Sequence, residues 1–330
     1  MPRCTSWFIK YLFTTYNTFD YDFKMTKIIF SRKGFDSSTG GMPSYKRDET
    51  LISFPIPSQK NTLTTYNDCR LGKYVKELSN NKIQPTDTCH FDPNLDYGEF
   101  GQVGASQTHL QNNKVKVGDL FLFWGWFRET MTINKKTVFS KKDPGHYRFF
   151  GWLQIGKIIH LGKDPSWYLA ETEQNPNSTS HPHTIGYWKE NNTLYLASKK
   201  LDAFGLKDYY GFGKFKASEK TNLSINPSIK KSKWKCPKWL NPKHGGCGMT
   251  YHNDLTRWDE NTVDVVGRGQ EFVAVPNKVD ECKKWLRNIF RDAKTIEEVE
   301  YFKQLSKDIT EEALRRAYIH KDQWIKDTFH

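Results

Sequence analysis

One loop, Ser31 to Gly41, holds the side chains with the clearest capacity for chemistry. It follows a short apolar run, Ile28 to Phe30, that predicts a buried strand. Its cationic, acidic and hydroxyl groups include those of Ser31, Arg32, Lys33, Asp36 and Ser37. Cations beside a glycine-containing backbone are typical of phosphate sites, so we predict an anion-binding loop. A plain polar turn is the alternative. The spacing is that of neither a Walker loop nor a dinucleotide fold.

Histidines farther along the chain could add acid–base chemistry to this loop. We predict that Asp36 acts together with His90 or His109 as acid and base. Side chains from other segments would help to hold the phosphate and the rest of the substrate. These predicted contacts are Gln107, Arg268 and Gln270.

Two short motifs could offer metal ligands, His90-Phe-Asp92 and His181-Pro-His183. Neither has a third partner at a diagnostic spacing, so we assign no metal ligands. The six cysteines include no Cys-x-x-Cys pair, which argues against a zinc ribbon and a disulfide framework and favours the reducing cytoplasm. The sequence does not identify a cofactor.

Two aromatic-rich runs give the strongest structural signal. Val117 to Phe127 and Arg148 to Ile159 predict the long strands of a hairpin, with a third strand at Thr137 to Ser140 between them. Gly125 and Gly151 lie inside these runs. They predict bulges, or places where another chain or a ligand comes close.

The same two runs could form an aromatic receptacle for a base. A base that has been flipped out of a helix needs flat apolar walls and a few hydrogen-bonding groups that recognise its edge. The candidates are Trp124, Trp126, Arg128, Trp152 and Gln154. The alternative is that these rings pack the interior of a small barrel.

The segment from Lys214 to Lys243 concentrates positive charge. It contains nine lysines and a single acid, Glu219, together with Trp234 and Trp239. Lysine and tryptophan together are typical of surfaces that follow a nucleic-acid backbone, whereas a solvated lysine face is the alternative. The net charge of +13 and the pI near 9.2 also favour an anionic partner.

Periodicity predicts further elements and the ends of the chain. The expected helices are Leu71–Ser79, Gly104–Asn112 and Asp280–Arg291, and the expected strands are Leu51–Ile56, Thr193–Ser198 and Thr262–Val266. Thr295 and Glu298 predict a capping box, and Thr310 starts a last helix. No apolar run reaches the roughly 20 residues that a bilayer requires. Residues 1–24 are expected to be a disordered or spurious leader before a true start at Met25.

Eight motifs resemble the nucleotide modification associated domain 3 family of bacteria and phages. Between about Met25 and Phe290 they are Ser31-Arg-Lys-Gly-Phe-Asp-Ser-Ser, Leu51-Ile-Ser-Phe-Pro-Ile-Pro, Cys89-His-Phe-Asp-Pro, Gly104-Ala-Ser-Gln-Thr-His-Leu, Gly118-Asp-Leu-Phe-Leu-Phe-Trp-Gly-Trp-Phe-Arg, Phe150-Gly-Trp-Leu-Gln-Ile-Gly, Thr193-Leu-Tyr-Leu-Ala-Ser and Arg268-Gly-Gln-Glu-Phe-Val. The family is named for gene neighbourhoods rich in enzymes that alter bases. The resemblance therefore implies partner enzymes of a DNA-modification or phage-defence system, and no particular reaction.

A weaker resemblance covers Val117 to Ser198, which looks like the small barrels of the pseudouridine-synthase-associated and EVE-like classes. Some of those barrels hold a modified base in an aromatic cage. This resemblance implies a physical reason for the aromatic content of the two long runs.

We therefore predict an α+β fold with one main domain, residues 25–291, and a helical extension, residues 292–330. Its centre is a curved or closed antiparallel β-sheet with flanking helices. The predicted function is a nucleic-acid- or nucleotide-binding protein that acts on a modified nucleotide or base. The alternatives are a non-catalytic reader of modified bases and a scaffold for a neighbouring enzyme, so the sequence does not decide whether the protein is an enzyme.

Overall fold

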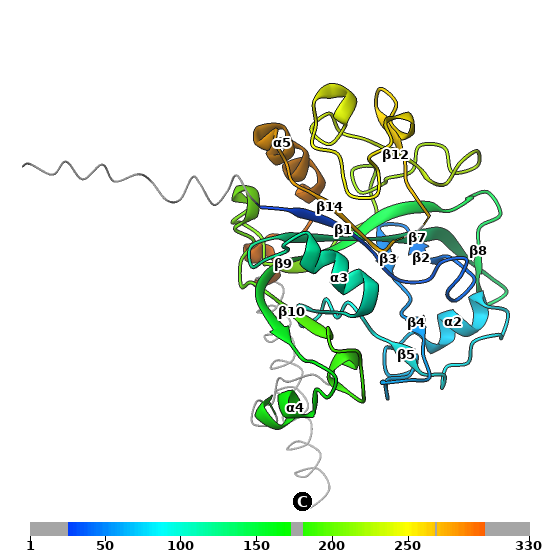
Figure 1. Ribbon diagram of the computed structural model, residues 1–330. Helices are drawn as coiled ribbons and strands as arrows, with labels where there is room; N and C mark the ends of the chain where they lie inside the picture. Colours follow the sequence, from blue (N-terminus) through cyan, green and yellow to red (C-terminus); the bar gives the residue numbers. More distant parts are fainter. Residues whose placement is uncertain (1–25, 173–180, 268, 301–330) are drawn as a thin grey trace, which may run out of the picture.

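A ten-stranded sheet that curls into a half barrel forms the centre of the computed structural model (Figure 1). The structure describes residues 26–172, 181–267 and 269–300. The ten strands are β1 (Ile28–Arg32), β2 (Ser44–Arg47), β3 (Thr50–Ile52), β6 (Glu99–Gln102), β7 (Leu120–Ile133), β8 (Lys136–Phe139), β9 (His146–His160), β10 (Thr193–Ala197), β11 (Phe212–Lys214) and β14 (Glu271–Ala274). The main path through the sheet is β14-β1-β7-β9-β10-β6, and the other strands extend β7, β9 and β2.

Smaller elements surround this sheet. Two two-stranded sheets are formed by β4 (Ile56–Pro57) with β5 (Cys89–His90) and by β12 (Lys233–Lys235) with β13 (Thr262–Asp264). The helices are α2 (Gly72–Leu78), α3 (Gly104–Asn112), α4 (Ser166–Thr172) and α5 (Val279–Phe290). Short 3-10 turns are η1 (Pro182–Thr184), η2 (Ala203–Gly205), η3 (Pro242–His244) and η4 (Leu255–Arg257).

Alternation along the central strands divides their side chains between two cores. In β7, Leu122 and Trp124 face one side of the sheet, and Phe121 and Phe123 face the other. The first side is covered by α5 and much of the segment 201–265, and the second side by α3 (Figure 1). Burial of both faces explains why β7 is apolar at almost every position of its first half.

The core beneath α5 contains most of the buried tryptophans. Those exposed by 3 % or less are Trp124, Trp152, Trp234, Trp239 and Trp258. Trp124 and Trp234 meet edge to face with ring centroids 4.5 Å apart, and Trp152 packs on Phe290 of α5 at 4.9 Å. The predicted aromatic receptacle therefore does not form at Trp124 and Trp152, because the core leaves these rings no open face for a base.

The strand glycines mark close approaches of the chain's own backbone, rather than of another chain or a ligand, and a bulge lies beside them. A Cβ atom on Gly125 would lie 2.8 Å from the carbonyl oxygen of Lys33, and one on Gly151 would lie 2.9 Å from that of Gly213. The β7–β9 register also shifts between Phe123 and Trp124. The occupant at both glycines is this chain itself.

The main path through the half barrel ends at β6 and β14, and we call the gap between these two strands the seam. Helix α3 follows β6 directly and packs against β14 (Figure 1). A buried hydrogen bond also spans the seam, since Gln102 Nε2 donates to Glu271 Oε1 at 2.6 Å. The helix and this bond hold together two segments that are far apart in sequence.

Several predicted elements are confirmed. Helix α3 has the predicted bounds, and β8 overlaps the predicted third strand of the hairpin. The capping box is also present, because the backbone N–H of Thr295 donates to the Glu298 carboxylate at 2.7 Å and that of Glu298 donates to the Thr295 hydroxyl at 3.3 Å.

Two details of the sheet differ from the predictions. The single strand expected at Leu51–Ile56 is divided into β3 and β4, because Pro55 has no N–H and that of Phe54 donates to Ser44 Oγ at 3.1 Å. In addition, β1 and β2 both pair with β7 in parallel, so the mainly antiparallel sheet is mixed around β7.

The predictions for residues 1–24 and for a helix from Thr310 lie outside the described residues. Within the described ranges, no helix has the length and apolar character that crossing a membrane requires.

Candidate functional site

A cleft of about 730 Å³ opens at the seam. We call it the seam cleft. Its walls come from the loop after β1, the β4–β5 region, the junction of β6 and α3, and the segment after η1. The charged and aromatic side chains that line it are Arg32, Lys33, Asp36, Lys60, His90, Asp92, His183, Tyr187, Trp188 and Lys189.

The loop after β1 is held by its own carboxylate. Asp36 Oδ1 accepts hydrogen bonds from the backbone N–H groups of Ser38 and Thr39 at 2.8 and 2.7 Å, and from the Ser38 hydroxyl at 2.7 Å. Burial opposes ionisation of Asp36, but these bonds and the nearby Arg32 outweigh it and lower the pKa. Asp36 therefore fixes the loop that carries Arg32, and its Oδ1 atom is already occupied.

The cations of the seam cleft fall into two kinds. The ammonium group of Lys33 lies 3.2 Å from the Glu271 carboxylate and above the ring of Phe100, so its charge is matched inside the protein. Among the described residues, Lys60 and Lys189 pair with no carboxylate. Arg32 lies between these cases, because it donates to the Gly267 carbonyl at 3.2 Å and lies 3.9 Å from Asp36.

The first turn of α3 points its backbone toward the same space. Val103 occupies the cap position and offers no side-chain cap. The amide of Asn191 clamps Gly104, accepting from its N–H at 2.9 Å and donating to its carbonyl at 2.8 Å. Ala105 and Ser106 of this turn line the cleft. Such a turn favours an anion in addition to the cationic side chains.

Behind these cations lies a buried carboxylate, Asp92. Its Oδ1 atom accepts from the Gly101 backbone N–H at 2.8 Å and contacts His181 Nε2 at 3.1 Å. Burial opposes ionisation, but the hydrogen bond from His181 and the nearby His90 hold the pKa of Asp92 well below its usual value. The side chain of Asp92 is therefore a fixed carboxylate.

Two histidines beside Asp92 have defined tautomers. The backbone N–H of His183 donates to His181 Nδ1 at 3.2 Å, so His181 carries its proton on Nε2 and donates it to Asp92. His183 Nδ1 lies 2.6 Å from Asn192 Oδ1, an acceptor, so His183 carries its proton on Nδ1. Burial lowers the pKa of His183 to about 3, which keeps its ring neutral with a bare Nε2 atom.

His90 completes this cluster. Its Nε2 atom lies 3.8 Å from Asp92 Oδ2, and its ring centroid lies 5.1 Å from that of His183. One donor atom each from His90, Asp92 and His183 lie within 4.8 Å of one another. In the sequence, neither His90-Phe-Asp92 nor His181-Pro-His183 has a third metal ligand at a diagnostic spacing. The fold brings the two motifs together, so that they jointly supply three donor atoms, and the question of a metal ion is open again.

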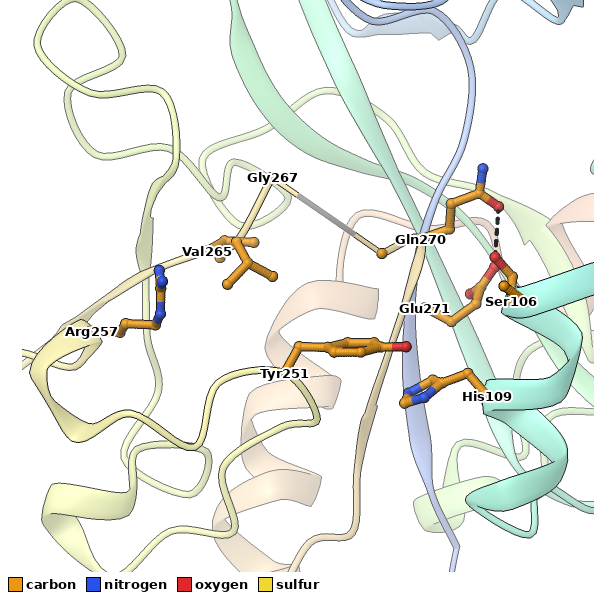
Figure 2. A pocket seen from close by; sticks show the side chains of 11 residues that line it. Ser106, His109, Tyr251, Arg257, Val265, Gly267, Gln270 and Glu271 are labelled. Atoms are coloured by element: carbon orange, nitrogen blue, oxygen red, sulfur yellow. Dashed lines mark hydrogen bonds between the residues drawn. The ribbon is translucent and has the colours of Figure 1, made fainter.

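A second cavity, of about 590 Å³, lies on the other side of α3's first turn. We call it the His109 cavity. Figure 2 shows Ser106 and His109 of α3 facing Tyr251, Gln270 and Glu271. The Ser106 hydroxyl donates to Gln270 Oε1 at 3.2 Å, and both residues line both cavities, so this bond forms part of the wall between them (Figure 2).

His109 is held against its neighbours in this cavity. Its Nε2 atom lies 2.9 Å from the Thr250 hydroxyl, and its ring stacks on Tyr251 at 4.4 Å. Burial lowers the pKa of His109, an effect only partly offset by the negative charge of Glu271. The ring therefore favours the neutral form, which can accept a proton.

Glu271 lies at the base of the wall and is only 1 % exposed. Its Oε1 atom serves both Gln102 and Lys33, while its Oε2 atom has no hydrogen-bond partner among the described residues. An unpartnered buried carboxylate oxygen is costly, so Glu271 is a candidate for contact with a bound group.

The structure brings part of the predicted site together. Arg32, Lys33, Asp36, His90 and Gln270 all line the seam cleft. His109 instead lines the His109 cavity, which it shares with Gln270, so the two alternative partners of Asp36 lie in different cavities. Ser37 is exposed on the loop, and Arg268 lies outside the described residues.

Other predicted contacts serve the fold. Ser31 is buried opposite Glu271 in the β1–β14 register. Gln107 Oε1 accepts from the Tyr195 hydroxyl at 2.9 Å, Gln154 Oε1 accepts from the Ala203 N–H at 2.9 Å, and Trp152 Nε1 donates to the Tyr210 carbonyl at 2.9 Å. Gln107, Gln154 and Trp152 thus have internal partners. The Ser31 hydroxyl is buried without a hydrogen-bond partner among the described residues. None of the four side chains lines the seam cleft.

Arg128 and Trp126 belong to the hairpin end of the sheet. Arg128 donates twice to the Ser140 carbonyl, at 3.1 and 2.8 Å, and so braces β7 against β8. The ammonium group of Lys231 lies 3.9 Å from the ring centre of Trp126 and covers that ring. Neither residue lines the seam cleft.

The lysine-rich segment is largely neutralised by carboxylates. Six of its nine lysines form ion pairs: Lys214 with Asp96, Lys216 with Glu49, Lys220 with Asp292, Lys230 with Asp264, Lys233 with Asp259 and Lys235 with Glu219. Trp234 and Trp239 are buried. The partners of five of these lysines lie outside the segment, which is why its composition suggested a bare cationic surface.

Sequence reasoning missed Lys60, Trp188 and Lys189, because each lies in a loop that forms no recognisable motif. It noticed Asp92 and His183 but did not join them. Their signal was a repeated two-residue spacing, His90-x-Asp92 and His181-x-His183, but this spacing does not show that the two motifs meet.

Comparison with known proteins gives a single result. No curated protein and no solved structure matches the chain. A family model, nucleotide modification associated domain 3, matches residues 27–275 and thus includes every described lining residue of the seam cleft. The chain therefore belongs to the nucleotide modification associated domain 3 family, whose name associates it with nucleotide modification.

Proposed function

We propose that the seam cleft binds a phosphorylated nucleoside, free or within a nucleic acid, and that the protein acts on it chemically. The observation that carries this proposal is that cationic, carboxylate and imidazole side chains meet in one cleft. Lys60 and Lys189 lie in the same cleft as the buried carboxylate Asp92 and the imidazoles of His90 and His183. Cations suit a phosphate, whereas a carboxylate beside neutral imidazoles suits proton transfer.

Two aromatic residues of the cleft could receive the base. Tyr187 is 78 % exposed, and Trp188 stacks on His183 with 4.3 Å between ring centroids. A base that stacks here would lie within reach of the cations on the loop after β1. These two rings differ from those of the predicted aromatic barrel. Burial of Trp124 and Trp152 disfavours the hypothesis that the barrel recognises a modified base without catalysis.

The family relationship supports the same ligand class, because its name refers to nucleotide modification. The described cysteines are all unpaired, which is compatible with the cytoplasm, where nucleotides and DNA-modifying partner enzymes would be met. The reaction partners are nucleic acid or nucleotides, and no membrane is involved in this proposal.

Binding of a nucleoside, its monophosphate, its triphosphate and short DNA across a salt series tests the phosphate site. We expect the phosphorylated forms to bind and the bare nucleoside to bind about tenfold more weakly or worse. Lys189→Gln should weaken binding about tenfold and reduce its salt dependence. Lys235→Gln, which removes a lysine of the neutralised segment, is the matched control and should change little. Equal losses in both variants would place the ligand elsewhere.

Mass spectrometry of nucleotides and base-modified DNA after incubation tests the chemical step. A product that His90→Ala abolishes, while nucleotide binding persists, is the expected result. Binding that distinguishes modified from plain DNA without any product would instead support a reader.

A further inference from the structure

We propose that His90, Asp92 and His183 bind a divalent first-row transition-metal ion in the seam cleft. This site goes beyond the proposed nucleotide function and does not depend on it, because the donor atoms are arranged by the protein alone. The three residues come from β5, the turn after it, and η1, which are brought together by β6.

The first argument is the orientation of His183. Its Nδ1–H donates to Asn192 Oδ1 at 2.6 Å, and the amide of Asn192 is fixed in turn because Nδ2 donates to the His183 carbonyl at 2.8 Å. This leaves Nε2 of His183 as a bare donor atom. Fixing one ring nitrogen so that the other can bind is the arrangement by which proteins prepare a histidine ligand.

The second argument is that the two carboxylate oxygens of Asp92 have different surroundings. Its Oδ1 atom is occupied by Gly101 N–H and His181, which fixes the carboxylate. Its Oδ2 atom faces His90 Nε2 at 3.8 Å. That distance is too long for a hydrogen bond, but it suits two atoms that share one metal ion.

The third argument is the size of the cluster. The three donor atoms lie within 4.8 Å of one another. Two ligands bonded at about 2.1 Å to one tetrahedral zinc ion lie about 3.4 Å apart. The widest donor pair therefore needs to approach by up to about 1.4 Å, and His90, whose side chain is 16 % exposed, has space to move.

The packing around the donors also fits a metal centre. Burial of a carboxylate among neutral rings is costly, and a cation offsets that cost. Trp188 stacks on one face of His183 and restricts that ring. The remaining coordination positions would open into the seam cleft, where His90, Asp92 and His183 are all part of the lining.

The donor set indicates which ions fit. Two imidazole nitrogens and one carboxylate oxygen are ligands for Zn²⁺, Fe²⁺, Mn²⁺ or Co²⁺, whereas Mg²⁺ and Ca²⁺ prefer oxygen atoms throughout. Three protein ligands with open positions are typical of catalytic rather than structural metal sites. A metal ion here could bind the phosphate or a water molecule.

Cobalt titration of the full chain, stripped with a chelator, tests the site directly. We expect one Co²⁺ per chain, a visible absorption band and competition by Zn²⁺. His90→Ala should weaken binding at least about 100-fold, since even outer partners of a ligand cost 10–100-fold. His160→Ala removes an exposed histidine on β9 and is the matched control, with unchanged binding.

Folding of each variant is checked by circular dichroism. If His90→Ala fails to fold, His90→Gln and the unaltered protein keep the proposal testable, because Zn²⁺ but not Mg²⁺ should raise the unfolding temperature of the unaltered chain. The proposal is overturned if the unaltered chain binds no Co²⁺ or Zn²⁺, or if both His90 variants bind them as tightly as it does. Loss of nucleotide binding with metal binding retained would count against the proposed function alone.

Discussion

The segment from Lys214 to Lys243 and the seam cleft both contain lysines and tryptophans, but the structure uses them in opposite ways. In the segment, six of nine lysines pair with carboxylates and both tryptophans are buried. In the cleft, Lys60 and Lys189 pair with no carboxylate of the described residues, and Trp188 borders open space.

The difference teaches that local density of charge does not locate a ligand site. Exposed ion pairs contribute little stability, but they remove the excess charge that an anion would seek. Two unpaired cations beside a hollow are therefore a stronger indication of a binding site than nine lysines on a surface.

The largest expected effect tests whether the segment is core. Trp239 is 1 % exposed and packs on Trp285 of α5 with ring centroids 5.3 Å apart. Trp239→Ala should therefore lower the free energy of unfolding by about 3–5 kcal/mol, measured by urea denaturation. Folded protein should keep its affinity for Co²⁺ and nucleotide. A small loss of stability with weaker nucleotide binding would show that the segment is the binding surface.

The next effect compares one ion pair from each region. Glu271→Gln leaves Lys33 buried without a partner charge and should cost roughly 3 kcal/mol. Glu219→Gln removes the exposed partner of Lys235 and should cost less than about 1 kcal/mol. Denaturation of both variants under the same conditions measures the contrast. Equal losses of unfolding free energy in the two variants would contradict the distinction between the buried Lys33–Glu271 pair and the exposed Lys235–Glu219 pair.

A smaller effect tests whether Asn192 prepares His183 as a metal ligand in the seam cleft. Asn192→Ala removes the acceptor that fixes the tautomer of His183, so the affinity for Co²⁺ should fall about 10–100-fold. Asn191→Ala is the matched control. It releases the Gly104 clamp but leaves His183 untouched, so Co²⁺ affinity should persist while nucleotide binding weakens. Equal Co²⁺ affinities in the two variants would argue against a prepared histidine ligand.

The smallest effect concerns two histidines that border these regions: His252, which follows the segment in sequence, and His109, which lines the cavity beside the seam cleft. Burial lowers the pKa of His252, whose Nε2 atom accepts from the Val266 N–H at 3.1 Å, and that of His109. Because both pKa values are lowered on folding, the unfolded chain binds protons first as pH falls below about 6.5. Stability is therefore full above that pH and declines toward pH 5.

Denaturation at several pH values measures this decline. His252→Gln should flatten it more than His109→Gln, because His252 is 1 % exposed whereas His109 is only partly buried. The reverse order would mean that the interior beside Trp258 admits water more readily than the His109 cavity.

Much of the fold could be predicted because strand periodicity is a local property. The apolar runs of β7 and β9 and the helix α3 were found from their patterns alone. The parallel pairing of β1 and β2 with β7 could not be found in this way. A strand buried on both faces has the same composition whichever direction its neighbours run.

The candidate site was predictable only where it is continuous in sequence. The loop with Arg32 and Asp36 was recognised because its residues are adjacent. The contact of Asp92 with His181 joins residues 89 positions apart, and it depends on how β5 and η1 meet beside β6. Likewise, the rings of Trp124 and Trp152 suit stacking and core packing equally well, and the positions of β12 and α5, which cover them, decide between these uses.

The seam has a consequence for how the protein is made. Strand β14 is the last strand of the sheet to emerge from the ribosome, yet it supplies Glu271 to the His109 cavity and directly follows Gln270, which lines both cavities. A nascent chain that stops before this strand carries most of the sheet but lacks part of the cavity walls. Under the proposed function, binding of the nucleotide would require that synthesis has reached this final strand.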